Sequence, residues 1–225
     1  MAGLLNDFLS SVFTREEGVV PNAADMDTDS LENITFTAWK VRKKIQKLRP
    51  AEIGPRLLQE LEQEVADGLA LIYRKSMESG TVPVDWRCAN VTPIYKKGPR
   101  SDPGNYRPVS LTSVCCKIME SIIRDGLMEH LERNKLIGSS QHGFLPGKSC
   151  STNLLEFLEK VTREVDEGRP FDIVFLDFAK AFDKVPKNRL LEKLRAHGVR
   201  GGVLRWIGNW LTTASSPEWE EVRLE

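Results

Sequence analysis

Asp177 is the residue of this sequence whose type and position most directly suggest chemistry. It lies near the end of FDIVFLDF (171–178), a compact apolar run of β-forming residues that follows turn signals at Gly168 and Pro170. Such a run predicts a buried strand. A carboxylate there is costly to bury unless a cation pairs with it. Asp177 is therefore either a cation-binding group or a solvated residue at the exposed end of the strand, and the strand alone leaves both interpretations open.

The basic residues are segregated along the chain, although Lys+Arg and Asp+Glu are both 32 and the formal net charge is zero. Segment 40–49 (KVRKKIQKLR) contains six bases and no acid, and segment 180–205 contains eight bases against Asp183 and Glu192. Segment 87–107 contains five bases against Asp102 alone. Segregation of this kind can produce a positive groove for a nucleic acid. Each segment is equally consistent with a solvated helix face.

The elements that must position these residues are mostly helices. Apolar residues at helical spacing predict helices over about 2–13, 37–48, 57–78, 113–133, 151–166, 187–197 and 202–212. We also predict a short strand in WRCANVTPIYKKG (86–98), a Pro- and Gly-rich loop over 98–108, and an acidic surface linker over 14–36. Because helices and strands are mixed without strict βαβ alternation, the predicted fold class is α+β.

The composition argues against a membrane protein and against a zinc site. No apolar run approaches the roughly 18–20 residues that a membrane span needs. The N-terminus carries Asp7 where a secretory signal has basic residues, so we expect an intracellular protein, with nucleus and cytoplasm both open. The four cysteines lack CxxC spacing and the three histidines are scattered, so reduced thiols are expected instead of a zinc site.

Four segments, taken in order, resemble one known family. They are VPVDWRCANVTPIYKKG, DPGNYRPVSLTSVCCKIMESII, QHGFLPGKSCSTNLL and FLDFAKAFDKV. Together they are similar to the N-terminal part of the reverse transcriptase domain of non-LTR (LINE-type, jockey-like) retrotransposons. The specificity comes from several motifs in the right order. The resemblance implies the fingers subdomain and a partial palm of a right-hand polymerase.

The last of these segments resembles the motif that carries the first catalytic aspartate of that family. The resemblance implies that Asp177 binds both catalytic Mg²⁺ ions and that the backbone carbonyl of Phe178 also touches a metal. It implies that the amide of Ala181 holds the incoming triphosphate and that Phe182 packs under the sugar. These roles agree with general chemistry, because Mg²⁺ takes hard oxygen ligands and two metals can stabilise phosphoryl transfer.

The upstream segments imply nucleotide and template contacts. Arg107 in NYRPVSL inherits a contact with the triphosphate, for which a planar guanidinium fork is suited. A surface arginine in a Pro-rich loop is the alternative interpretation of Arg107. Lys97, with Lys96 beside it, matches the preceding basic turn and is assigned to nucleotide binding. The positions that match the template-binding motif are Gln141, Gly143, Phe144 and Lys148.

The resemblance also sets the expected domain boundaries and partners. We expect an amphipathic helix and acidic linker over 1–36, a helical extension over 37–80, and a partial reverse transcriptase domain over 81–225, with fingers over 81–170 and the start of the palm over 171–225. The implied partners are an RNA template, a DNA primer and dNTPs, with two Mg²⁺ ions as cofactors. No membrane partner is expected, and the oligomeric state is not determined.

The sequence departs from the family pattern at the second carboxylate pair, which relatives carry in a Tyr/Phe-x-Asp-Asp hairpin. These 225 residues contain no adjacent Asp-Asp. One aspartate cannot hold two metals in place, so we predict a fragment truncated before the catalytic hairpin and inactive alone. Whether the chain is an enzyme therefore stays open. The alternatives are a non-catalytic RNA or RNA–DNA binding remnant and a decayed transposon copy without a selected role.

Overall fold

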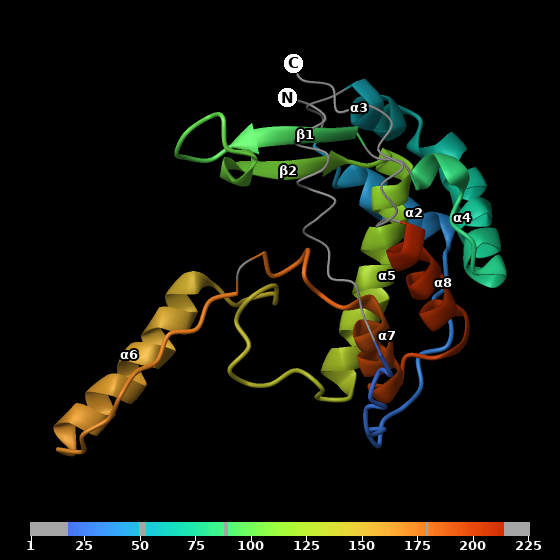
Figure 1. Cartoon of the computed structure of the whole chain (residues 1–225). Coiled ribbons are helices and arrows are strands. Elements are labelled where there is room, and N and C mark those ends of the chain that lie inside the picture. Colours follow the sequence, from blue (N-terminus) through green and yellow to red (C-terminus); the bar gives the residue numbers. More distant parts are fainter. Residues whose placement is uncertain (1–17, 50–52, 88–89, 179, 214–225) are drawn as a thin grey trace.

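A computed structural model describes residues 18–49, 53–87, 90–178 and 180–213. Figure 1 shows a helical body from which two arms project on the same side. The body is built from α2 (Ala38–Gln46), α3 (Ile53–Glu60), α4 (Glu62–Ser79), α5 (Val114–Arg133), α7 (Lys187–Ala196) and α8 (Gly201–Thr213). One arm is the hairpin of β1 (Asn90–Tyr95) and β2 (Tyr106–Leu111), and the other contains α6 (Cys150–Asp166). The α+β fold class is therefore confirmed.

The core of the body surrounds α5. Ile118, Met119, Ile122 and Ile123 of this helix are all buried in one cluster with residues of α2, α4 and α8. Removing apolar side chains from water is the main favourable term in folding. The predicted helices over 37–48, 113–133, 151–166, 187–197 and 202–212 are confirmed within a residue or two at their ends. The predicted helix over 57–78 starts earlier and is interrupted at Leu61, between α3 and α4.

Polar caps explain where several of these helices start and stop. The Thr37 side chain accepts a hydrogen bond from the Lys40 amide and so satisfies one of the free N–H groups at the start of α2. At the C-terminal end of α4, Gly80 adopts φ 67° and its N–H donates a hydrogen bond to Met77 O. This left-handed conformation is one that glycine takes without steric penalty, so Gly80 ends the helix.

The described part of the predicted surface linker, 18–36, is mostly exposed and forms no helix or strand, but backbone hydrogen bonds hold it against the body. The Leu31 amide donates to Gly198 O at 2.8 Å, and the Arg200 amide donates to Leu31 O at 2.9 Å. Ile34 and Phe36 are buried in the core. The acidic composition concealed these few apolar anchors, which a surface linker would not need. The predicted helix over 2–13 lies outside the described residues.

The hairpin arm corrects part of the predicted loop over 98–108. Residues 106–108 belong to β2, which pairs antiparallel with β1 so that Pro93 lies opposite Pro108 and Tyr95 opposite Tyr106. Proline lacks an N–H donor and is tolerated mainly at sheet edges. A hairpin of two strands consists of edges alone, which is why a Pro-rich sequence can still form β2 here. The connection contains a short 3-10 turn, Pro103–Asn105.

The predicted buried strand over 171–178 is wrong. This segment has no regular secondary structure, and Phe175 and Leu176 are 81% and 86% exposed. It runs back along α6 (Figure 1), where the Phe175 ring lies 5.8 Å from that of Phe157. A strand needs a neighbour to satisfy its backbone N–H and C=O groups. The two described strands pair with each other in the opposite arm, so this β-forming sequence has no described partner.

Trp206 connects α8 to α4 and provides a test of the core. Its side chain is 2% exposed, stacks on Trp210 with ring centroids 5.8 Å apart, and donates an indole hydrogen bond to Ser76 Oγ at 2.9 Å. We expect Trp206→Ala to lower the free energy of unfolding by about 3–5 kcal/mol, measured by urea denaturation. Trp39→Ala is the matched control because Trp39 is 65% exposed. Equal effects of the two substitutions would contradict this account of the core.

Candidate nucleotide and template site

Asp177 lies on the exposed segment 171–178, so its carboxylate is open to solvent. This agrees with the interpretation of a solvated residue, and the segment is not the strand end that the sequence predicted. Within the described residues, no group of three or more His, Cys, Asp or Glu side chains could hold a metal ion. The described donors therefore do not form a two-metal site around Asp177.

Residues 180–185 form a compact turn. The Lys184 amide donates to Lys180 O at 3.1 Å and the Val185 amide to Phe182 O at 3.3 Å, while Lys180 itself has φ 52°. Burial lowers the pKa of Lys180; Asp183 opposes this effect, and the charges of Lys184 and Lys96 add to it. The expected nucleotide-binding residues Ala181 and Phe182 are both exposed on this turn.

Phe144 and Phe182 bring the expected template motif to the expected nucleotide motif. Their rings meet edge to face with centroids 6.0 Å apart, although 38 residues separate them in sequence. Both rings are open to solvent, with 88% and 78% exposure. Phe144 also has φ 64°, a left-handed conformation that is uncommon for a residue other than glycine. Such outliers persist where the surroundings impose them and concentrate at functional sites.

His142 fixes the loop that carries Phe144. Its ring is buried and lies 3.0 Å from Thr152 Oγ1 through Nδ1 and 2.8 Å from Glu156 Oε2 through Nε2. Thr152 also forms a reciprocal capping box with Ser149 at the start of α6. The loop and the first turn of α6 are thus one hydrogen-bonded unit. Sequence reasoning missed this role because it treated the histidines as scattered; the spacing from His142 to Glu156 gives no helical or strand signal.

The remaining template residues lie on the same loop. The Gln141 side chain donates to Gly143 O at 3.0 Å, and the Lys148 amide donates to Leu145 O at 3.3 Å. The Lys148 side chain is exposed. A groove of about 420 Å³ between this loop, α5 and α7 is lined in part by Gln141, Gly143 and Phe144. Three of the four expected template residues therefore border one concave surface.

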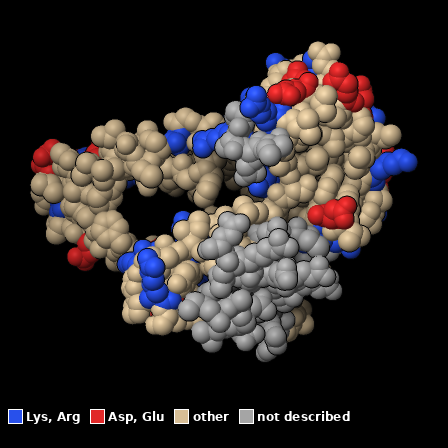
Figure 2. Space-filling model, turned by 90° about the horizontal axis from the view of Figure 1, so that it is seen from above, with Lys and Arg blue, Asp and Glu red and all other residues tan. Residues whose placement is uncertain are grey.

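Arg107 and Lys97 lie on the other arm. Arg107 is exposed on β2 opposite Ile94, and Lys97 is exposed in the turn that begins after β1. No contact in the described part of the chain joins either residue to Asp177. In Figure 2, an open gap separates the two arms of the space-filling surface. The expected nucleotide contacts are thus divided between two arms that face a common opening.

Residues 94–224 match the family described as reverse transcriptase (RNA-dependent DNA polymerase). Because the match covers more than half of the chain, the chain belongs to this family. The match includes the end of β1, all of β2 and α6, and the helices α5, α7 and α8.

Relatives refine the family to retrotransposon enzymes of the non-LTR type. The chain is 30% identical over 177 residues, 74% of its length, to the RNA-directed DNA polymerase from mobile element jockey of Drosophila melanogaster. It is 30% identical over 128 residues to the probable RNA-directed DNA polymerase from transposon BS of the same organism, and 25% identical over 137 residues to the Pol polyprotein of retrotransposable element R2 of Popillia japonica. The aligned parts cover 56% and 61% of this chain, respectively. The chain spans only 14–19% of the length of these three relatives.

The anchor of the template loop should depend on pH. Hydrogen bonds from Lys160 and then from His142 lower the pKa of Glu156 from 4.5 to about 2. A folded-state pKa below the unfolded value means that this contact contributes stability above pH 4.5 and loses it as the pH falls toward 2. We expect amide protection in the first turn of α6 to fall across that range, as measured by hydrogen exchange.

Glu156→Gln should remove most of this pH dependence, since an amide does not titrate. Glu159→Gln is the control, because Glu159 pairs with Arg163 at 2.9 Å on the same helix and does not contact the loop. A pH profile that is the same in wild type and Glu156→Gln would show that the carboxylate does not hold the loop.

Proposed function

We propose that this chain contributes the fingers and the start of the palm of an RNA-directed DNA polymerase, which extends a DNA 3′ end along an RNA template. Residues 81–170 correspond to the fingers and 171–225 to the start of the palm. The contact between Phe144 and Phe182 carries this proposal, because it joins template and nucleotide motifs as a polymerase requires. Family membership supports the reaction class.

The proposed roles follow the residues already placed on the two arms. Arg107 and Lys97 bind the triphosphate from the hairpin arm. The backbone of Phe178 and Ala181 contacts the nucleotide from the other arm, and Phe182 packs against its sugar. Gln141, Gly143, Phe144 and Lys148 contact the template. Asp177 is the catalytic residue and a ligand to Mg²⁺, which when bound would neutralise charge on the transferring phosphoryl group. Positioning and electrostatics account for most of the catalysis in reactions of this kind.

We expect these 225 residues alone not to extend a primer. They contain no adjacent Asp-Asp, and the described donors around Asp177 do not make a two-metal site. The measurement is incorporation of labelled dNTP on an RNA template with an annealed DNA primer and Mg²⁺. Template-dependent extension that disappears in Asp177→Ala would overturn this expectation.

Nucleotide binding tests the proposal without requiring turnover. We expect Arg107→Ala to weaken dNTP binding in the presence of RNA, primer and Mg²⁺ by about 10- to 100-fold, because hydrogen bonds to charged groups are worth about 1.5–3 kcal/mol. Equilibrium dialysis with a labelled dNTP measures this, and Arg107→Lys should recover only part of the affinity, since it loses the planar fork. Arg56→Ala is the control, on the exposed surface of α3 and paired with Glu60.

A non-catalytic binding remnant would give a different result in the same assays. Its RNA affinity would fall steeply with salt, it would survive Asp177→Ala, and no dNTP binding would depend on Arg107. Unchanged dNTP affinity in Arg107→Ala would therefore reject the polymerase assignment of the hairpin arm in favour of this alternative.

A further inference from the structure

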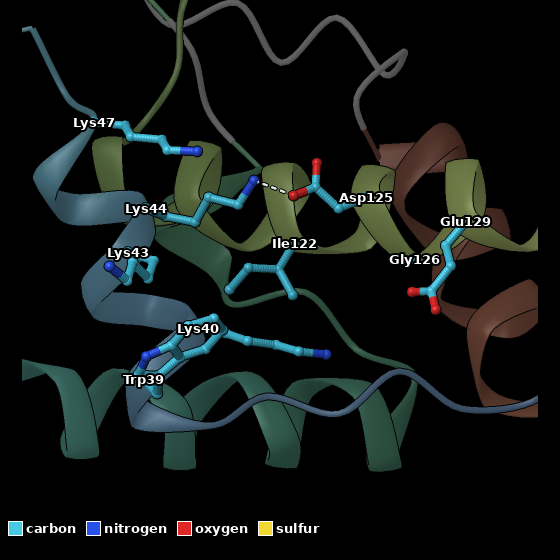
Figure 3. Close-up of a pocket in the computed structure, with 9 residues that line it drawn as sticks. All are labelled: Trp39, Lys40, Lys43, Lys44, Lys47, Ile122, Asp125, Gly126 and Glu129. Carbon is cyan, nitrogen blue, oxygen red and sulfur yellow. Dashed lines mark hydrogen bonds and ion pairs between the residues drawn. The ribbon is translucent and has the colours of Figure 1, made fainter. Parts of the chain in front are cut away.

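A second cavity lies between α2 and α5, on a different pair of elements from the residues above (Figure 3). Its volume is about 280 Å³. It is lined by Trp39 and three lysines of α2, by Lys47 directly after this helix, and by Ile122, Gly126 and two carboxylates of α5. The cavity thus combines an aromatic wall, a basic rim and an acidic end, and its volume is on the scale of one nucleotide.

Trp39 provides the aromatic wall. Its side chain is 65% exposed, so hydrophobic burial does not account for its position. Lys43 Nζ lies 5.8 Å from the centroid of its ring, an arrangement in which a cation interacts with the π system. An exposed aromatic beside lysines is the combination that single-stranded nucleic acids bind, with a base on the ring and phosphates on the charges.

The lysines at the rim of the cavity differ in their exposure and in whether a carboxylate already pairs with them. Lys44 is half-buried and forms an ion pair with Asp125 across the cavity, as Figure 3 shows. Burial alone would raise the pKa of Asp125, but hydrogen bonds and charge from Lys44 and Arg124 outweigh it, so this pKa lies below its usual value. Lys43 and Lys47 are exposed at the rim. Four lysines against two carboxylates leave the cavity positive overall.

Glu129 gives the far end of the cavity a different chemistry. Its side chain is exposed and lines the α5 wall. A carboxylate accepts hydrogen bonds from the exocyclic amino groups of cytosine, adenine or guanine, whereas uracil has no such donor. A base that stacks on Trp39 and points its amino group toward Glu129 would interact with both walls of the cavity.

The neighbouring surface suggests the path of the strand. A larger cavity of about 890 Å³ shares Asp125 and Glu129 with this one and reaches Phe144 of the template loop at its other side. An exposed aromatic ring therefore lines each of the two cavities, Trp39 the first and Phe144 the second. Arg124 and Arg133 also line the larger cavity.

We propose that the cavity between α2 and α5 binds one unstacked nucleotide of a single-stranded RNA. Its base stacks on Trp39, its phosphate lies at Lys43 and Lys47, and an amino group of the base donates to Glu129. That this RNA is the template strand rests on the proposed function; the nucleotide site itself rests on the residues of the cavity alone. Bases stack on aromatic side chains in single-stranded RNA recognition generally, which makes RNA the fitting ligand class.

Fluorescence anisotropy of the purified 225-residue chain with labelled oligo(rC), oligo(rA) and oligo(rU) tests this proposal. Trp39→Ala should weaken binding of oligo(rC) by about tenfold, and Trp39→Phe should recover most of it because the ring is kept. Since Trp39 is exposed, neither substitution should impair folding. Glu129→Ala should remove the preference for oligo(rC) and oligo(rA) over oligo(rU).

Two controls separate stacking from general charge. Heparin, a polyanion without bases, should lose affinity with Lys43→Gln or Lys47→Gln but not with Trp39→Ala. Lys75→Gln, at an exposed position on α4, should leave RNA affinity nearly unchanged. Unchanged affinity for oligo(rC) in Trp39→Ala, an equal loss for heparin, or tighter binding of the matching single-stranded DNA would each overturn the proposal.

Phe144→Ala distinguishes this proposal from the proposed function. If RNA affinity falls in Trp39→Ala but not in Phe144→Ala, the α2–α5 site stands and the template role of the loop fails. The opposite pattern overturns the α2–α5 site and leaves the template loop in place.

Discussion

The position of α4 determines the rest of the body, and two buried hydrogen bonds fix it. The Tyr73 hydroxyl donates to Cys115 O at 2.8 Å, and the Trp206 indole donates to Ser76 Oγ at 2.9 Å. Burial, reinforced by the nearby Cys115 and Cys116, raises the pKa of Tyr73 far above its usual range, so this phenol stays protonated as a donor. A polar group buried without a partner would be strongly unfavourable. Because α5 starts at Val114, directly after the hairpin, fixing Cys115 also fixes the root of one arm.

Local signals in the sequence were sufficient for most helices and insufficient for the strand at 171–178. A helix satisfies its backbone within itself, so the spacing of apolar residues and caps such as Thr37 and Ser149 largely determine it. The strand prediction rested on side-chain preference alone, whereas a strand also requires a partner that no local pattern specifies. The hairpin illustrates the converse. Three prolines over 98–108 suggested a loop, yet residues 106–108 belong to β2, which has β1 for a partner.

For the candidate sites, too, the sequence could indicate some features and not others. The residue types and order of the motifs were sufficient to single out Arg107, Phe144 and Asp177 and to indicate the family. Contacts between distant parts of the chain could not be predicted from the sequence. They include the Phe144–Phe182 pair and the buried His142. They also include the Trp39 cavity, whose walls come from helices about 80 residues apart. The basic run at 40–49 was visible in the sequence. Whether it was a solvated face or a binding surface depended on what α5 placed opposite it.

The pairing of residues near Leu31 with residues near Val199 has a consequence for how the chain is made. Asp25 and Arg195 form an ion pair at 2.7 Å across 170 positions, and α8 supplies Val203 and Trp206 to a core whose other walls are α2, α4 and α5. During synthesis, the earlier helices emerge from the ribosome long before these partners exist. The part of the α4 surface that Trp206 covers therefore stays exposed until α8 has been translated. Exposed surfaces of this kind are what chaperones bind.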